Sequence, residues 1–418
     1  MSHVAVFVAT AVLFAGLSTT LWGCVGSVRW MLGRTHPLPV REARIRPGRV
    51  GVLIAAHNEE KVIADTIVAV MRLVPAGQVF VASDASTDRT AEIVRARGAN
   101  VVELTESHGK AGALVAGLRH FGLTRRFAVI MILDADTVPS EDYLYSGLPL
   151  FDDPAVAAVA GRASTRWPAG AGWMARVLLA HRERLYVLFQ TLLKYGQAAR
   201  GLDAVAIVPG FASMYRADVL ETVDIAAPGL AIEDYNMTFE IHAKALGRIA
   251  FQPWSARAYT QDPATLADYV RQVGRWNLGF WQTLRRHRPR VRVFWASVTV
   301  FAAEVALSSV LVLALAVATI VAALGRLVRV DEWSPLPVPG GDMLVAAVIG
   351  VIVVDLVATV YVALLTRRFA IIAFAPAYTA LRVLDAALCL RALVHALTRR
   401  SSGVWRSPER RVEGQAAS

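Results

Sequence analysis

The chain has 418 residues, of which 55% are hydrophobic and only 18% are charged, and its formal net charge is +11. This balance is typical of an integral membrane protein with a sizeable soluble part. Many arginines flank apolar runs, so the basic excess favours anionic lipid headgroups over nucleic acid as a partner. The only two cysteines, Cys24 and Cys389, lie in apolar segments, and neither a disulfide framework nor a zinc site is indicated.

Three apolar stretches are long enough to cross a hydrocarbon core, which needs about 20 residues. They run approximately from Val4 to Val25, from Phe294 to Leu324 and from Met343 to Leu365. The first has no basic segment before it, so we expect an uncleaved anchor rather than a signal peptide. A further stretch, Phe369 to Leu397, contains proline and charged residues. We expect it to lie in the interface or to be re-entrant, with a fourth crossing as the alternative.

Arginines follow the first span, precede the second and follow the third. Because cytoplasmic flanks of membrane spans are enriched in Lys and Arg, these three flanking segments are expected in the cytoplasm. The sequence therefore predicts a multi-pass protein of the cell membrane. Residues 1–28 would be an anchor, residues 29–285 a cytoplasmic domain with interfacial helices, and residues 286–418 a membrane region with a basic cytoplasmic tail. The loop "DEWSPLPVPGGD" would lie outside.

Short apolar runs alternate with helical patterns after the first span. The runs "VGVLIAA", "QVFVAS", "NVVEL" and "FAVIMILDAD" are predicted strands, and the segments between them are predicted helices. This order predicts an α/β domain with a parallel sheet covered by helices on both faces. Ligands of such sheets bind at the carboxyl ends of the strands.

Polar side chains follow these strands. Glu59 comes after the first, Asp84 ends the second, and Asp134 and Asp136 end the fourth in "ILDADT". Two carboxylates at this spacing can reach one hard cation, Mg²⁺ or Mn²⁺, although a solvated turn is the alternative. Lys110 opens a predicted helix, where a lysine opposes the helix dipole unless an anion binds there; a surface lysine is the alternative.

Two later motifs add candidates. Glu233 and Asp234 precede a helical stretch, where they are either ordinary caps or include a general base. "RQVGRW" sets Gln272, Arg275 and Trp276 about one helical turn apart, close to the second predicted span. "GFASMYR" begins at Gly210, where small side chains allow a backbone to approach a ligand.

The motifs "HNEE", "SDASTDRT", "GKAGAL", "DADT", "IEDYNMT" and "QVGRW" occur in the order seen in family 2 glycosyltransferases. Over roughly residues 50 to 285 the sequence resembles the membrane-bound subgroup that includes hyaluronan, chitin, cellulose and poly-N-acetylglucosamine synthases. The resemblance implies a GT-A fold and inverting transfer from a nucleotide-sugar. The Q-x-x-R-W element is characteristic of the processive members.

The resemblance also implies a role for each matching residue. Asp136 and Asp134 would hold Mg²⁺ or Mn²⁺, and Asp234 would be the catalytic base supported by Glu233. The expected nucleotide-binding residues are Glu59, Asp84, Lys110 and Asp134, and the expected acceptor and diphosphate residues are Gln272, Arg275 and Trp276. Ile232 departs from the family's usual threonine before the two acids.

The resemblance implies a UDP-sugar donor such as UDP-N-acetylglucosamine, a glycan or lipid-linked acceptor, and contact with membrane lipids. Three spans are fewer than the pore-forming synthases have, so export would need self-association or a partner. One alternative is transfer of a single sugar to a polyprenyl phosphate or lipid. Another is a non-catalytic membrane scaffold that only binds nucleotide.

Overall fold

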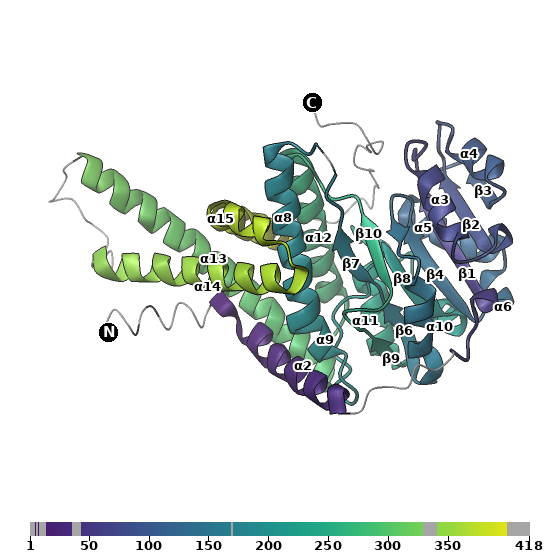
Figure 1. The fold of residues 1–418 in the computed structure, drawn as a ribbon, viewed down its shortest axis with the longest axis horizontal. Coiled ribbons are helices and arrows are strands. Elements are labelled where there is room, and N and C mark those ends of the chain that lie inside the picture. The colour runs from purple at the N-terminus through teal and green to yellow at the C-terminus, as the bar shows by residue number, and fades with distance from the viewer. Residues whose placement is uncertain are drawn as a thin grey trace.

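The computed structural model describes residues 14–35, 43–168, 170–328 and 341–398, together with residues 5 and 7. An α/β domain forms one end of the molecule, and two long helices extend from the other (Figure 1). The start of the predicted first span, nearly all of the loop "DEWSPLPVPGGD" and the basic tail lie outside the described residues.

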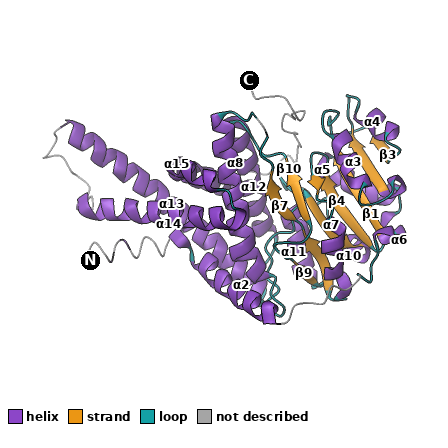
Figure 2. Ribbon diagram, in the orientation of Figure 1, coloured by secondary structure: helices purple, strands orange, loops and turns teal. Residues whose placement is uncertain are grey.

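The central sheet is mixed and has the order β3-β2-β1-β4-β8-β6-β9. Its first four strands are parallel, as predicted: β1 (Val50–Ala56), β2 (Val79–Asp84), β3 (Asn100–Leu104) and β4 (Val129–Asp134). The sequence prediction missed β8 (Ala212–Arg216), which runs antiparallel between β4 and β6 (Val156–Ala160). The edge strand β9 (Arg248–Ala250) is parallel to β6. The mostly parallel α/β fold is thus confirmed, with an antiparallel insertion (Figure 2).

Helices cover both faces of this sheet because side chains alternate along its buried strands. Val52 and Ile54 of β1 pack in one core with α3 (Ile63–Met71) and α4 (Thr90–Ala96). Leu53 of β1 packs in the other, which contains the helices α5 (Gly109–His120), α10 (Ala217–Thr222) and α11 (Asp234–Lys244). The strand ends between these layers are the predicted binding edge.

A second sheet and two amphipathic helices join the domain to its helical end. The small sheet has the order β5-β10-β7, with β5 (Val138–Pro139), β7 (Arg162–Thr165) and β10 (Arg257–Thr260). Beside it, α8 (Trp173–Leu188) continues through a π-helical segment, η4 (Phe189–Lys194), into α9 (Tyr195–Gln197). The motif "QVGRW" lies on α12 (Leu266–Arg286).

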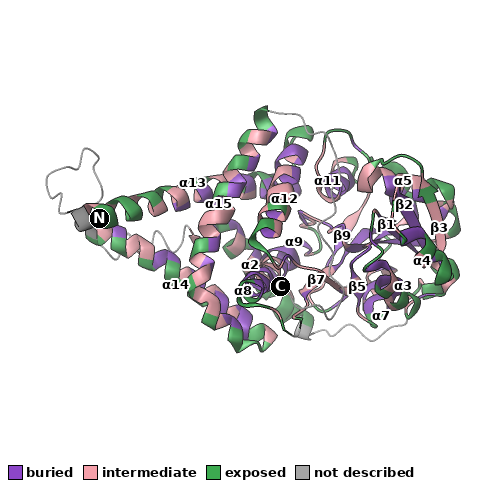
Figure 3. Cartoon of the chain, turned by 90° about the horizontal axis from the view of Figure 1, so that it is seen from above, coloured by how far each residue is buried: buried purple, intermediate pink, exposed green. Residues whose placement is uncertain are grey.

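Two helices in the described part of the chain are long and apolar enough to cross a membrane: α13 (Val293–Val328) and α14 (Gly341–Thr366). They contain the second and third predicted spans, and only 11% and 28% of their apolar stretches are buried. Along both helices, where they extend away from the domain, most residues are exposed or intermediate in burial (Figure 3). The helix α2 (Leu17–Thr35) lies beside η4 and α9, and α15 (Ala375–Thr398) packs in one cluster with α12 and α13. An interfacial position for α15 stays a prediction.

Acidic residues inside the two long helices are paired with other helices. Glu304 of α13 accepts a hydrogen bond from the backbone N–H of Ser18, at 3.0 Å. Asp355 of α14 is 2% exposed and binds Arg184 of α8 and Arg382 of α15, the latter at 2.6 Å. Asp355 therefore locks α14 to the helices around the domain.

We predict that Asp355→Ala destabilises the protein by about 3–5 kcal/mol, because it leaves buried arginine charge without a partner. The measurement is the midpoint of thermal unfolding in detergent. Asp342→Ala is the control, since that aspartate is exposed in the first turn of the same helix. Equal midpoints for the two variants would contradict the locking role.

Candidate active site

Carboxylates from three chain segments meet a single lysine at the carboxyl edge of the sheet. Lys110, in the first turn of α5, places its Nζ 2.6 Å from Asp134 Oδ1 at the end of β4. The same Nζ lies 2.8 Å from Glu233 Oε1, immediately before α11. All three side chains are largely shielded from solvent, so this ion-paired group joins the strand edge to both helices.

The charges in this group are unequally compensated. Burial alone would lower the pKa of Lys110, but Asp134 and Glu233 outweigh it and hold that pKa above its usual value. Burial raises the pKa of Asp134, and nearby Asp136 and Glu233 raise it further against the opposing effect of Lys110. Asp134 is therefore a carboxylate whose negative charge would be stabilised by a further cation.

Asp234 is the second acid of the "ED" pair and begins α11. Its carboxylate accepts hydrogen bonds from the backbone N–H groups of Gly210, at 3.2 Å, and Tyr235, at 2.8 Å. Burial and the neighbouring Glu233 nevertheless raise its pKa to about 6. The pKa of Glu233 is lowered: burial opposes the shift, but Lys110 and, more weakly, Arg275 outweigh it. Adjacent acids with pKa values shifted in opposite directions are suited to different roles.

Gly210 lies in the middle of this group. A Cβ atom there would lie 3.0 Å from Glu233 Oε1, 3.1 Å from Lys110 Nζ and 3.3 Å from Asp234 Cβ. These contacts are tighter than ordinary van der Waals separations, so only glycine fits without displacing a charged group.

Asp84, at the end of β2, and Glu59, which follows β1, are two further buried acids. Asp84 is fully buried, and its carboxylate accepts hydrogen bonds from the backbone N–H groups of His108 and Gly109 and from the Ser107 hydroxyl, at 2.7–3.0 Å. It therefore fixes the loop that delivers Lys110. Glu59 is 1% exposed, and its N–H donates to Thr90 at 2.8 Å. Contacts from Asp84 or Glu59 to a nucleotide stay predictions.

One face of α12 clamps the segment before the "ED" pair. Gln282 Oε1 accepts a hydrogen bond from the N–H of Ala231 at 2.8 Å. Gly279, one turn earlier, packs so closely on Ile232 that a Cβ would come within 2.1 Å of it. Ile232, the departure from the family's threonine, is thus matched by a glycine on α12. Arg275 lies on the same face, near Glu233.

Arg182 of α8 organises the remaining motif residues, and sequence reasoning missed it. It is 2% exposed and donates to Gln272 Oε1. Its guanidinium lies 4.0 Å from the centre of the Trp276 ring and its Nε 3.6 Å from Asp262 Oδ1. Tyr186, one turn along α8, donates to the same carboxylate oxygen at 3.1 Å. An arginine inside the apolar helical pattern "RVLLAHRERLYVL" is the signal that would have identified this residue.

The structure therefore brings the predicted residues into two groups. Lys110, Asp134, Glu233 and Asp234 form the first, and Gln272 and Trp276 join Arg182 in the second. Asp136 lies between them, since it raises the pKa of Asp134 and, after burial, contributes to raising the pKa of Asp262 to about 6.

The oxygen donors suit a hard divalent cation. Among the described residues, no three His, Cys, Asp or Glu side chains are arranged to hold a metal. However, Mg²⁺ needs only one or two carboxylates when substrate phosphates and water complete its ligands. Asp134 and Asp136 can supply those carboxylates. The pKa of Asp134 is raised because burial and the nearby acids outweigh the positive charge of Lys110, so an added cation would be stabilising there.

Comparison with known proteins gives concordant matches. Residues 47–279 match the model of the family described as glycosyltransferase like family 2. A poly-beta-1,6-N-acetyl-D-glucosamine synthase of Staphylococcus epidermidis is 24% identical over 296 residues, which cover 68% of this chain and 67% of that protein. A 4,4'-diaponeurosporenoate glycosyltransferase of Staphylococcus aureus is 31% identical over 111 residues, covering 25% and 28% of the two chains.

A solved structure shares the fold over nearly the whole chain. The mannosyltransferase PcManGT from Pyrobaculum calidifontis, in complex with GDP-Man and Mn²⁺, aligns with a TM-score of 0.51 at 19% identity. The alignment covers 95% of this chain and 99% of that one.

We predict that Gly210→Ala lowers catalytic turnover at least about tenfold while the protein still folds, because the added methyl group displaces Lys110 or the two acids. Gly77→Ala is the matched control, since no atom lies within 4 Å of a Cβ at that position. Turnover and thermal unfolding are measured for both variants. Full activity in Gly210→Ala would show that the close contacts are not needed.

Proposed function

This chain belongs to the glycosyltransferase-like family 2, and from that premise we propose that it transfers sugars from a nucleotide-sugar to a growing glycan at the cytoplasmic face of the membrane, with inversion. The observation that carries the proposal is the contact of Lys110 with Asp134 and Glu233 beside the raised-pKa carboxylate of Asp234. This arrangement supports the proposal because a carboxylate suited to a cation, a cationic side chain and a candidate base meet at one strand edge.

The chain's own residues account for the steps of a single displacement. Asp234 takes the proton of the attacking acceptor hydroxyl, and its pKa of about 6 leaves it ionised yet basic at neutral pH. Glu233 remains ionised and keeps Lys110 in place. Lys110 and Arg275 pair with the departing diphosphate. Asp134 and Asp136 would hold Mg²⁺ or Mn²⁺, which would supply positive charge to neutralise the diphosphate.

The acceptor side is proposed to be the group around Arg182. One face of the Trp276 ring is covered by the guanidinium of Arg182, which fixes the ring's orientation. An oriented indole offers a flat apolar surface to a sugar ring. Because α12 carries Trp276 and also clamps the segment before Asp234, the acceptor would be aligned with the base through one rigid helix.

The likeness to a poly-N-acetylglucosamine synthase supports UDP-N-acetylglucosamine as the donor and a lengthening chain as the acceptor. The two long apolar helices support a multi-pass position in the cell membrane, and the arginines that flank them support a cytoplasmic position of the α/β domain. Export of a long product would then require self-association or a partner protein.

The test is a donor screen on the purified protein with Mn²⁺ or Mg²⁺, followed by mass spectrometry of the product. We predict multiple additions from one donor, and loss of transfer in Asp234→Asn with the fold intact. The base must be deprotonated, so kcat/KM should fall as pH decreases through about 6. Addition of a single sugar to a lipid would replace the polymer proposal, and full activity of Asp234→Asn would end the assignment of the base.

We predict that Trp276→Ala shortens the product more than it slows the first transfer, because acceptor stacking contributes about 1 kcal/mol to holding the chain between additions. Trp276→Phe is the control that keeps a flat ring. Product lengths are compared at equal donor consumption. An unchanged length distribution in Trp276→Ala would contradict the stacking role.

A further inference from the structure

A cavity of about 680 Å³ lies beside α8 and is not used by the proposed reaction. Its volume is in the range of small-molecule sites. The strands β7 and β10 form one side, and residues of α8 and η4 line it further. The remaining wall comes from α2 and α14, so the cavity lies where the small sheet meets the apolar helices.

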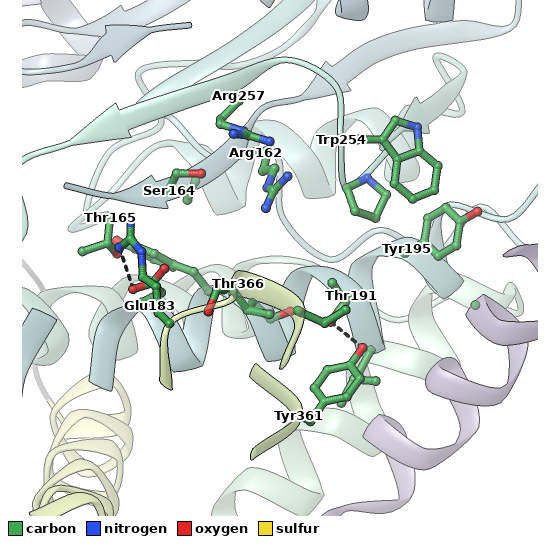
Figure 4. A pocket seen from close by; sticks show the side chains of 18 of the residues that line it. Arg162, Ser164, Thr165, Glu183, Thr191, Tyr195, Trp254, Arg257, Tyr361 and Thr366 are labelled. Atoms are coloured by element: carbon green, nitrogen blue, oxygen red, sulfur yellow. Dashed lines mark hydrogen bonds and ion pairs between the residues drawn. The ribbon is translucent and has the colours of Figure 1, made fainter. Parts of the chain in front are cut away.

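Two arginines project into this cavity from directly paired strand positions (Figure 4). Arg162 of β7 and Arg257 of β10 are register partners in the parallel ladder. Register partners point to the same face of a sheet, and like charges placed there repel each other. Burial and the neighbouring Arg257 lower the pKa of Arg162 to about 10. The sheet thus holds two adjacent, half-buried positive charges at an energetic cost.

The side chains in the described ranges compensate these charges only in part: Tyr259 and Glu183 act to raise the pKa of Arg162, but burial and Arg257 outweigh them. Neither guanidinium has a hydrogen-bond acceptor or an acid within ion-pair distance among those residues. The acid on the cavity wall, Glu183, is already engaged: its Oε2 accepts from Trp167 Nε1 at 2.7 Å and pairs with Arg368 at 3.0 Å. Half-buried charge that its neighbours compensate only in part is destabilising, which favours binding of an anion from outside the chain.

The other residues that line the cavity indicate the chemical class of the anion. A pair of guanidinium forks suits the oxygens of a phosphate group. Trp30 and Trp254, exposed by 46% and 54%, and Tyr361 of α14 line the cavity beside apolar Leu365. Tryptophan and tyrosine at such a junction are typical of the membrane–water interface. The ligand should therefore have a phosphate at the sheet end and an apolar part along α2 and α14.

We propose that this cavity binds the phosphate headgroup of an anionic membrane lipid, which Arg162 and Arg257 would contact. The lipid would neutralise the arginine pair and tie the small sheet to α2 and α14. This proposal is independent of the donor, the acceptor and the transfer reaction. Its readout is binding and stability rather than activity.

The test compares the full chain in phosphatidylcholine vesicles with and without phosphatidylglycerol. We expect the anionic lipid to raise the midpoint of thermal unfolding by about 5 °C in the wild-type protein and by much less in Arg162→Gln/Arg257→Gln. The matched control is Arg288→Gln/Arg292→Gln, which removes two exposed arginines near the start of α13 that lie outside the cavity lining and should keep most of the rise. In phosphatidylcholine alone, the cavity variant should be at least as stable as the wild type, because it removes repulsion.

Three outcomes would overturn the proposal. The first is an equal rise in the cavity variant, which would show that phosphatidylglycerol acts elsewhere. The second is a strong loss of stability of that variant in phosphatidylcholine, which would show that protein groups already compensate the arginines. The third is the same rise in wild-type protein from inorganic phosphate alone, which would assign the site to a soluble anion rather than a lipid.

Discussion

The ion-paired group of Lys110 with Asp134 and Glu233 is the contact on which the rest of the site depends. It joins three segments that are distant in sequence, and each is fixed by a separate device. Asp84 holds the loop before Lys110, strand pairing holds Asp134, and α12 clamps the segment before Glu233. The lysine is buried with its partners. Moving any one segment would therefore leave a buried charge without its partner, which would lower the free energy of unfolding by several kcal/mol.

The helices α8 and α12 link this group to the apolar end of the molecule. Arg182 connects them through Gln272 and Trp276, while Arg184, only two residues further along α8, binds Asp355 of α14. Two residues apart on a helix point to different sides. Arg182 thus joins α8 to α12, which carries part of the site, and Arg184 joins α8 to the long apolar helix α14. A shift of α8 would therefore change both the geometry of the site and the packing of α14.

The sequence predicted those parts of the fold that depend on local pattern. The four parallel strands, their helices and the two long apolar helices are each visible as periodicity within one segment. The strand β8 was missed because its antiparallel position between β4 and β6 is decided by distant partners. The same reason hid Arg182 and Asp262, which become meaningful only when α8 packs beside α12. The expected roles of all the predicted site residues remain predictions, because they concern ligands rather than the chain's own contacts.

The structure has charge imbalances of opposite sign on the two sides of Tyr186, a residue of α8. On one side, Asp134 and Asp262 have raised pKa values because carboxylates are crowded and buried, which favours a cation. On the other, Arg162 has a lowered pKa because it is buried beside a second arginine, which favours an anion. Tyr186 lines the cavity and also hydrogen-bonds to Asp262, so this single side chain separates the two regions.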